Sequence, residues 1–144
     1  MDALQKMAAF ILSYPGWEAG VTLTFDSAEN TPGALGLFPE GVEEISLRQD
    51  IMGNRESRQR MAFSLYGVAD DVDGGASLVA RFQSWVHDQS AAGLAPTFGD
   101  APQKEQLRAE KGSLSRREST GGLYCVKLTA EFTKHYEVNE NGEN

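Results

Sequence analysis

The stretch "LYCVKLTAEFTKHYE" at residues 123–137 has the clearest secondary-structure pattern in the sequence and points to the fold class. Apolar and polar side chains alternate along it, as in a β-strand with one buried face. "STGG" at 119–122 has turn-forming residues, and a weaker strand is predicted within about 105–115. These segments together predict an antiparallel hairpin. The side chains expected to face inward on its second strand are Tyr124, Val126, Leu128, Ala130 and Phe132.

A second hairpin is predicted between residues 42 and 66, with its turn at Gly53 and Asn54, which tolerate positive φ. A shorter alternating strand is expected at 21–26. The residues expected on one side of the first hairpin strand are Ile45, Leu47 and Ile51, and on one side of the second are Met61, Phe63 and Leu65. The outward residues of that second strand are Glu56, Arg58 and Arg60.

Two amphipathic helices complete the predicted elements. Asp2 is a suitable N-cap for a helix that ends before Pro15, and a polar connection at 68–77 precedes a second helix. The apolar stripes are Leu4, Met7, Ala8, Ile11 and Leu12 in the first helix, and Leu78, Phe82, Trp85 and Val86 in the second. The sequence predicts an α+β fold of about five mostly antiparallel strands in two hairpins, with two helices packed on one face. Residues 1–137 are expected to form a single domain, and 138–144 a polar C-terminal tail.

Composition narrows the class of protein. The 144 residues carry 21 acidic and 13 basic side chains, a net charge of −8, which argues against general affinity for nucleic acid. Cys125 is the single cysteine, so an internal disulfide is excluded. No apolar run approaches the roughly 18–20 residues that span a bilayer, and no secretory signal is expected. We therefore expect no membrane partner.

No catalytic constellation is found in the sequence. "DDVDGG" at 70–75 lacks the glutamate that completes a calcium loop, and no phosphate-binding glycine motif occurs. His87 and His135 have no second ligand at metal spacing, and Cys125 has no helix N-terminus to activate it. The chain is thus predicted not to be an enzyme and to need no cofactor. A small enzyme using Cys125 or His87 remains an alternative hypothesis.

Two long connections, 27–41 and 93–104, contain apolar residues that are unusual in loops. They are expected either to dock on a neighbouring molecule or to fold back over the domain's own core. Residues 104–118 carry a local charge of +2 and either protect a strand edge or contact an acidic partner. A DNA-binding role for this basic segment is a further alternative, which the overall charge disfavours.

Four blocks in the same order carry a family resemblance: "LFPEGVEEISLRQDIMGN" at 37–54, "FQSWVHDQSAAGLAPTFGD" at 82–100, "LRAEKG" at 107–112 and "VKLTAEFTKHYE" at 126–137. Together they resemble a family of small tailed-phage proteins found in prophages of Gram-positive bacteria and called minor capsid proteins. That family is similar to the tail terminators of long-tailed phages. The resemblance covers roughly two thirds of the chain.

The resemblance implies a non-catalytic ring, commonly a hexamer, that caps the tail tube, joins it to the head-tail connector proteins and is assembled in the host cytoplasm. DNA would pass through such a ring without specific binding. A head–tail stopper or a capsid-associated minor protein is the alternative role in the virion. The residues expected at a subunit or partner interface are Leu37, Phe38, Pro39, Leu94, Pro96, Phe98, Arg108 and Lys111.

Overall fold

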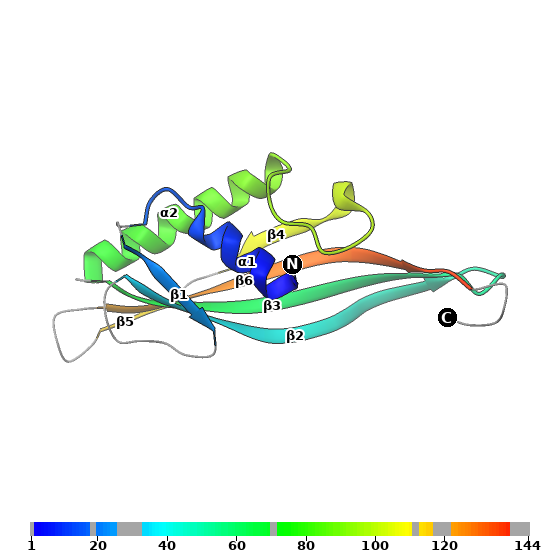
Figure 1. Ribbon diagram of the computed structural model, residues 1–144, viewed down its shortest axis with the longest axis horizontal. Coiled ribbons are helices and arrows are strands. Elements are labelled where there is room, and N and C mark those ends of the chain that lie inside the picture. Colours follow the sequence, from blue (N-terminus) through cyan, green and yellow to red (C-terminus); the bar gives the residue numbers. More distant parts are fainter. Residues whose placement is uncertain are drawn as a thin grey trace.

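The computed structural model describes residues 2–17, 20–25, 33–69, 72–110, 113–116 and 122–138. It confirms the predicted α+β class (Figure 1). The elements in chain order are α1 (Ala3–Leu12), β1 (Thr22–Phe25), β2 (Ala34–Gln49), β3 (Arg55–Ala69), α2 (Val72–Ala91), the 3-10 turn η1 (Pro102–Lys104), β4 (Gln106–Ala109), β5 (Ser113–Arg116) and β6 (Gly122–Tyr136).

The described strands form one sheet in the order β1-β2-β3-β6-β4, and β5 also pairs with β6. All pairs are antiparallel except β1 with β2. At its centre β3 pairs with β6 without a register shift, from Arg55 opposite Tyr136 to Ala69 opposite Gly122. The predicted single strand within 105–115 is wrong in detail, because two short strands, β4 and β5, pair with successive parts of β6.

Both helices lie on the same face of the sheet (Figure 1). Asp2 and Gln5 form a capping box that begins α1, as the sequence predicted for Asp2. Aromatic rings pack α1 and the residues after it against α2: Phe10 stacks on Trp85 with centroids 4.7 Å apart, and Tyr14, just beyond α1, meets Phe82 edge-on at 5.3 Å. Helix α2 begins within the predicted polar connection at 68–77, so that interpretation is wrong. Its two adjacent glycines and its acidic residues resemble a turn in composition.

Strand length leaves part of the sheet uncovered. Strands β2 and β3 have 16 and 15 residues, and each spans roughly 50 Å at about 3.3 Å per residue. Helix α2 has 20 residues and spans only about 30 Å. The three longest strands therefore continue past the helices as a three-stranded arm (Figure 1). We define the arm as residues 39–62 and 131–138.

The core occupies the part of the sheet beneath the helices. Its fully buried side chains include Leu35 and Leu37 of β2. These residues overturn part of the predicted 27–41 loop, because β2 begins at Ala34; residues 26–32 lie outside the described part of the chain. A register shift between Pro39 and Gly41 lets the strand continue through two residues that usually interrupt strands.

No helix in the described residues is long and apolar enough to cross a membrane.

Candidate subunit interface on the β2–β3–β6 arm

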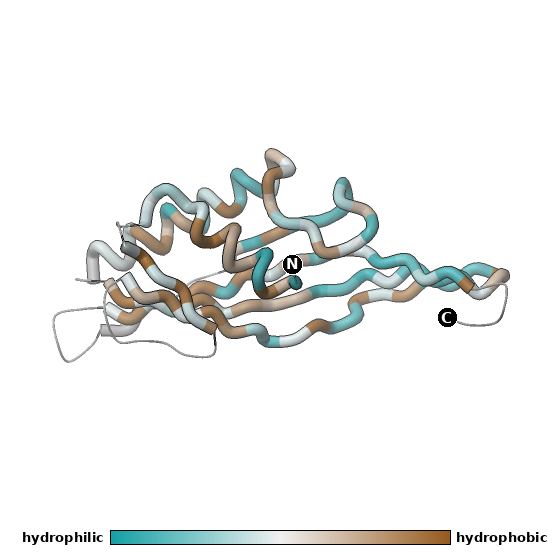
Figure 2. The backbone as a smooth tube through the Cα atoms, viewed as in Figure 1, coloured by the Kyte–Doolittle hydropathy of each residue, from teal (hydrophilic) through white to brown (hydrophobic). Residues whose placement is uncertain are grey.

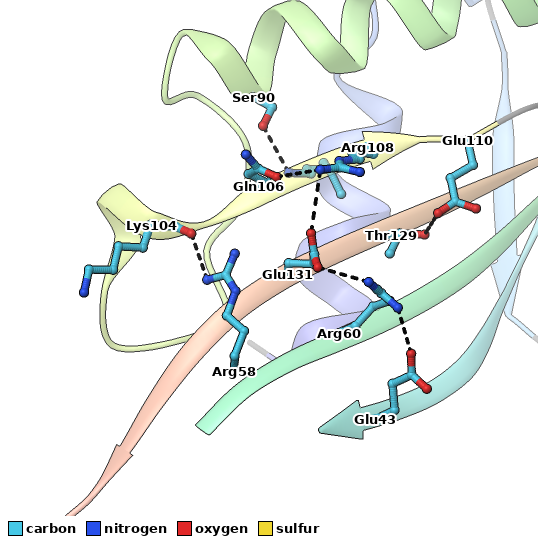
Figure 3. Close-up of polar contacts among 11 residues, drawn as sticks. Glu43, Arg58, Arg60, Ser90, Lys104, Gln106, Arg108, Glu110, Thr129 and Glu131 are labelled. Atoms are coloured by element: carbon cyan, nitrogen blue, oxygen red, sulfur yellow. Dashed lines mark hydrogen bonds and ion pairs between the residues drawn. The ribbon is translucent and has the colours of Figure 1, made fainter. Parts of the chain in front are cut away.

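The sheet face opposite the helices carries a row of paired charges. Because Glu43, Arg60 and Glu131 are opposite one another on β2, β3 and β6, the guanidinium of Arg60 bonds both carboxylates, at 3.0 and 3.2 Å (Figure 3). Arg108 of β4 lies 3.9 Å from Glu131. Hydrogen bonds to Glu43 and Glu131 raise the pKa of Arg60, so it remains charged. The predicted outward orientation of Arg60 is confirmed.

This face is hollowed beside Arg60, with a volume of about 600 Å³. Each carboxylate in the hollow has a partner: Glu43 binds Arg60, Glu40 lies 3.8 Å from Lys127, and Glu110 accepts a hydrogen bond from Thr129 at 3.1 Å. Among the residues described, no cysteine, serine or histidine lines it, and its threonine, Thr129, donates its hydroxyl to Glu110. The hollow therefore has the character of a neutralised polar surface.

The residues considered for catalysis lie apart. Burial raises the pKa of the Cys125 thiol, with only partial opposition from its hydrogen bond to Tyr66, so the reactive thiolate is disfavoured. His135 lies on the arm, with its ring nitrogens 3.5 Å from Glu56 and 3.8 Å from Asp100. His87 is exposed on α2. Within the described ranges, no three His, Cys, Asp or Glu residues are placed to hold a metal ion.

The arm carries apolar residues that the domain does not bury. In Figure 2 they lie among the hydrophilic segments that make up most of the arm. The most exposed are Ile51, at 103%, and Met52, at 74%, both in the turn between β2 and β3. Singly exposed apolar residues are common, but a group on one projecting element is typical of an interaction surface. The full set of exposed large apolar residues on the arm is Val42, Ile45, Leu47, Ile51, Met52, Tyr136 and Val138.

The turn that presents Ile51 and Met52 is held in one conformation. The carboxylate of Asp50 accepts hydrogen bonds from the backbone N–H of Met52 and of Asn54, each at 2.9 Å, and from the Asn54 side chain at 3.1 Å. Gly53 has a φ of 90°, which glycine adopts without strain. The N–H of Val138 donates to the Asn54 side chain at 2.9 Å, which ties the turn to the end of β6. Such an ordered turn loses little conformational entropy on binding.

We predict that the pKa of Asp50 reports on this turn. Desolvation acts to raise the pKa of Asp50, but hydrogen bonds from Asn54, Met52 and Gly53 outweigh it and bring the pKa below its ordinary 3.8. The stabilising contribution is therefore present above the ordinary pKa and is lost as pH falls through the lowered value. In NMR, the amide shifts of Met52 and Asn54 should titrate with a midpoint below 3.8. Asp50→Ala should abolish that titration, and a midpoint above 3.8 would contradict the bonded turn.

The two edges of the sheet are protected in different ways. Asp100 covers the edge of β6: its N–H donates to the Thr133 carbonyl at 2.8 Å, and its carboxylate accepts from the His135 N–H at 2.7 Å. Ser90 of α2 similarly accepts from the N–H of Leu107 in β4 at 3.0 Å. On the other edge, β1 pairs with β2 only as far as Leu37, so the described β1 does not cover the rest of β2.

The remaining edge of β2 carries features that discourage strand addition. Pro39, two register shifts, and the charges of Glu40, Glu43 and Glu44 all disfavour backbone pairing with another strand. Recognition through the arm is therefore expected to depend on its side chains. The apolar turn is the part of the arm best suited to it.

The predicted interface residues divide into buried and exposed groups. Leu37 is 0% exposed and belongs to the core, and Phe38 packs edge-on against Tyr66; their placement in a loop was wrong. Pro39 is exposed at a register shift of β2. Leu94 is 66% exposed just after α2.

The other predicted interface residues also differ in their surroundings. Phe98 is half-buried, 6.1 Å from the ring of Phe132, and Pro96 is also half-buried. Arg108 is exposed beside the paired charges, and Lys111 lies outside the described residues. The sequence-based set did not include Ile51 and Met52. Two consecutive large apolar residues directly before "GN" were the signal that would have indicated an exposed turn.

These features define the class of protein as an α+β domain with a projecting arm and an exposed apolar turn. No protein-family model matches the sequence, and no curated protein matches it either.

Proposed function

We propose that this protein is a structural subunit of a phage virion, a tail terminator that assembles into a ring at the end of the tail tube. The observation that carries the proposal is the arm, whose ordered turn exposes apolar side chains with no partner in the described part of the domain. Burying such side chains between subunits is favourable by about 25 cal/mol per Å² of apolar surface. The four sequence blocks that resemble phage minor capsid proteins supply the virion context.

The outer face of the sheet is compatible with this role. Arg60 on this face binds both Glu43 and Glu131, so its positive charge is offset by two carboxylates and attracts passing DNA less. The half-buried thiol, whose pKa is raised, and the separated histidines give little support to the enzyme hypothesis.

The role is tested by deleting the gene in an inducible prophage. We expect tail tubes longer than normal in electron micrographs, because nothing would stop the tube from growing, and few tails joined to heads. Complementation with the intact gene should restore tail length. Tails of normal length that fail to join heads would instead support the head–tail stopper, and normal complete particles would refute both roles.

A further inference from the structure

We propose that the arm turn of one copy, with Ile51 and Met52, docks in the shallow pocket beside the C-terminal end of α2 in the next copy. This inference rests on the proposed ring and names the contact that builds it. The pocket has a volume of about 350 Å³ and lies between α2 and β4. Its lining includes His87, Ser90, Ala91, Glu105, Leu107 and Arg108.

The docking turn presents exposed apolar side chains on an ordered backbone. Ile51 is 103% exposed and Met52 74%, while Asp50 and Asn54 hold their backbone in place. Covering these exposed apolar side chains lowers the free energy through the hydrophobic effect. Because the turn is already ordered, little conformational entropy is lost when it binds. The protected edge of β2 makes side-chain docking more favourable than strand addition.

The receiving surface lies around the C-terminal end of α2. Leu94, three residues beyond the end of α2, is the most exposed large apolar residue of the described chain outside the arm. The neighbouring pocket combines the small side chain of Ala91 with charged residues, and the almost fully buried Leu107 lies at its floor. Its volume is at the lower end of pockets that bind small ligands, about 300–1,000 Å³.

Charge favours this pairing over contact between two turns. Asp50 is the one charged residue within 50–54, so two turns in contact would place like charges together. Arg108 at the pocket is exposed; it donates a hydrogen bond to the Gln106 side chain at 3.0 Å and lies 3.9 Å from the Glu131 carboxylate. Glu105 is already occupied by the N–H groups of Phe98 and Gly99. An incoming Asp50, which keeps its own hydrogen bonds within the turn, therefore meets a guanidinium that has further N–H donors to offer.

The geometry of the contact fits a ring. The turn and the pocket are different surfaces of the same subunit, so contact between copies is head-to-tail. Contacts of this kind generate closed rings when the rotation between subunits closes, whereas a contact between identical surfaces stops at a dimer.

Cysteine cross-linking tests the contact in a full-length Cys125→Ala chain. The double variant Ile51→Cys with Leu94→Cys should give a ladder of covalent oligomers under mild oxidation, and each single variant should remain uncross-linked. Ile51→Cys with Leu12→Cys is the matched control, because Leu12 is an exposed leucine on α1. Efficient dimers from Ile51→Cys alone would overturn the proposed contact. So would covalent oligomers formed by the control pair as readily as by the Ile51→Cys with Leu94→Cys pair.

Self-association gives a second readout that separates this contact from the proposed function. Met52→Asp should weaken self-association about tenfold or more in sedimentation, while Leu12→Asp should leave it unchanged. Equal assembly of Met52→Asp and the natural chain would refute the docking but leave the ring intact. A natural chain that stays monomeric at every concentration would refute the docking directly, whereas the ring function itself is decided by tail length in the gene deletion.

Discussion

Leu37→Ala is expected to reduce the free energy of unfolding by about 2–5 kcal/mol. Leu37 is 0% exposed and lies on β2 opposite Leu65, which is also fully buried. Removing three carbons there loses their burial and leaves a cavity between two strands whose backbones are fixed by pairing. Urea unfolding followed by circular dichroism measures the change, provided that the denaturant dependence stays constant.

Leu94→Ala is the matched control, since it makes the same substitution at a leucine that is 66% exposed. Its effect on stability should stay within about 0.5 kcal/mol. The two variants distinguish Leu37 as a core residue from Leu37 as an interface residue in a loop. If Leu37→Ala unfolded at the same urea concentration as the natural protein but impaired assembly, Leu37 would be an interface residue after all and the start of β2 at Ala34 would be wrong.

Local sequence patterns predicted those helices and strands whose buried face and ends are marked by their own residues. The alternation at 123–137 predicted β6 and its inward residues, such as Val126 and Leu128, which are buried. Asp2 and the apolar stripe predicted α1. In each case one face of the element meets the core along its length, so the period of the apolar residues equals the period of burial.

The elements that sequence reasoning missed contain residues whose usual preference is overridden by tertiary contacts. Pro39 and Gly41 suggested a loop, but the long pairing with β3 and a bulge retain them in β2. Gly74 and Gly75 suggested a connection, each costing a helix about 1 kcal/mol, yet α2 includes both. These costs are small beside the burial of Phe82 and Val86 later in the same helix.

The exposed apolar residues of the arm were predicted only in part, because the exposure of a strand's side chains depends on which other elements cover that strand. The alternation placed Ile51 with Ile45 and Leu47 on one side of a strand, but Ile51 is in the turn and all three are exposed. Strands of roughly 50 Å beneath a helix of about 30 Å leave an uncovered end. Which apolar residues fall on that end follows from the assembled fold and not from their spacing.

Gly99→Ala is expected to cost about 3 kcal/mol and to release the 93–104 connection from β6. A β-carbon at Gly99 would lie 2.2 Å from the backbone oxygen of Thr133. That oxygen cannot move away easily, because it belongs to β6 and accepts the N–H of Asp100 at 2.8 Å. The connection must shift instead, and it would lose the packing of Phe98 on Phe132. Chemical denaturation measures the loss.

Gly93→Ala is the control that distinguishes the steric clash at Gly99 from the strain of an unfavourable backbone conformation. Gly93 has a φ of 74° with no atom within 4 Å of an added β-carbon, so its substitution should cost only about 1 kcal/mol. Hydrogen exchange gives the decisive comparison, because the His135 N–H bonds to the Asp100 carboxylate. In Gly99→Ala that amide should exchange faster, since the edge of β6 is uncovered, whereas in Gly93→Ala it should remain protected. Equal stability and equal protection in the two variants would mean that the connection is not docked on β6, and the sheet would then have an open edge on that side too.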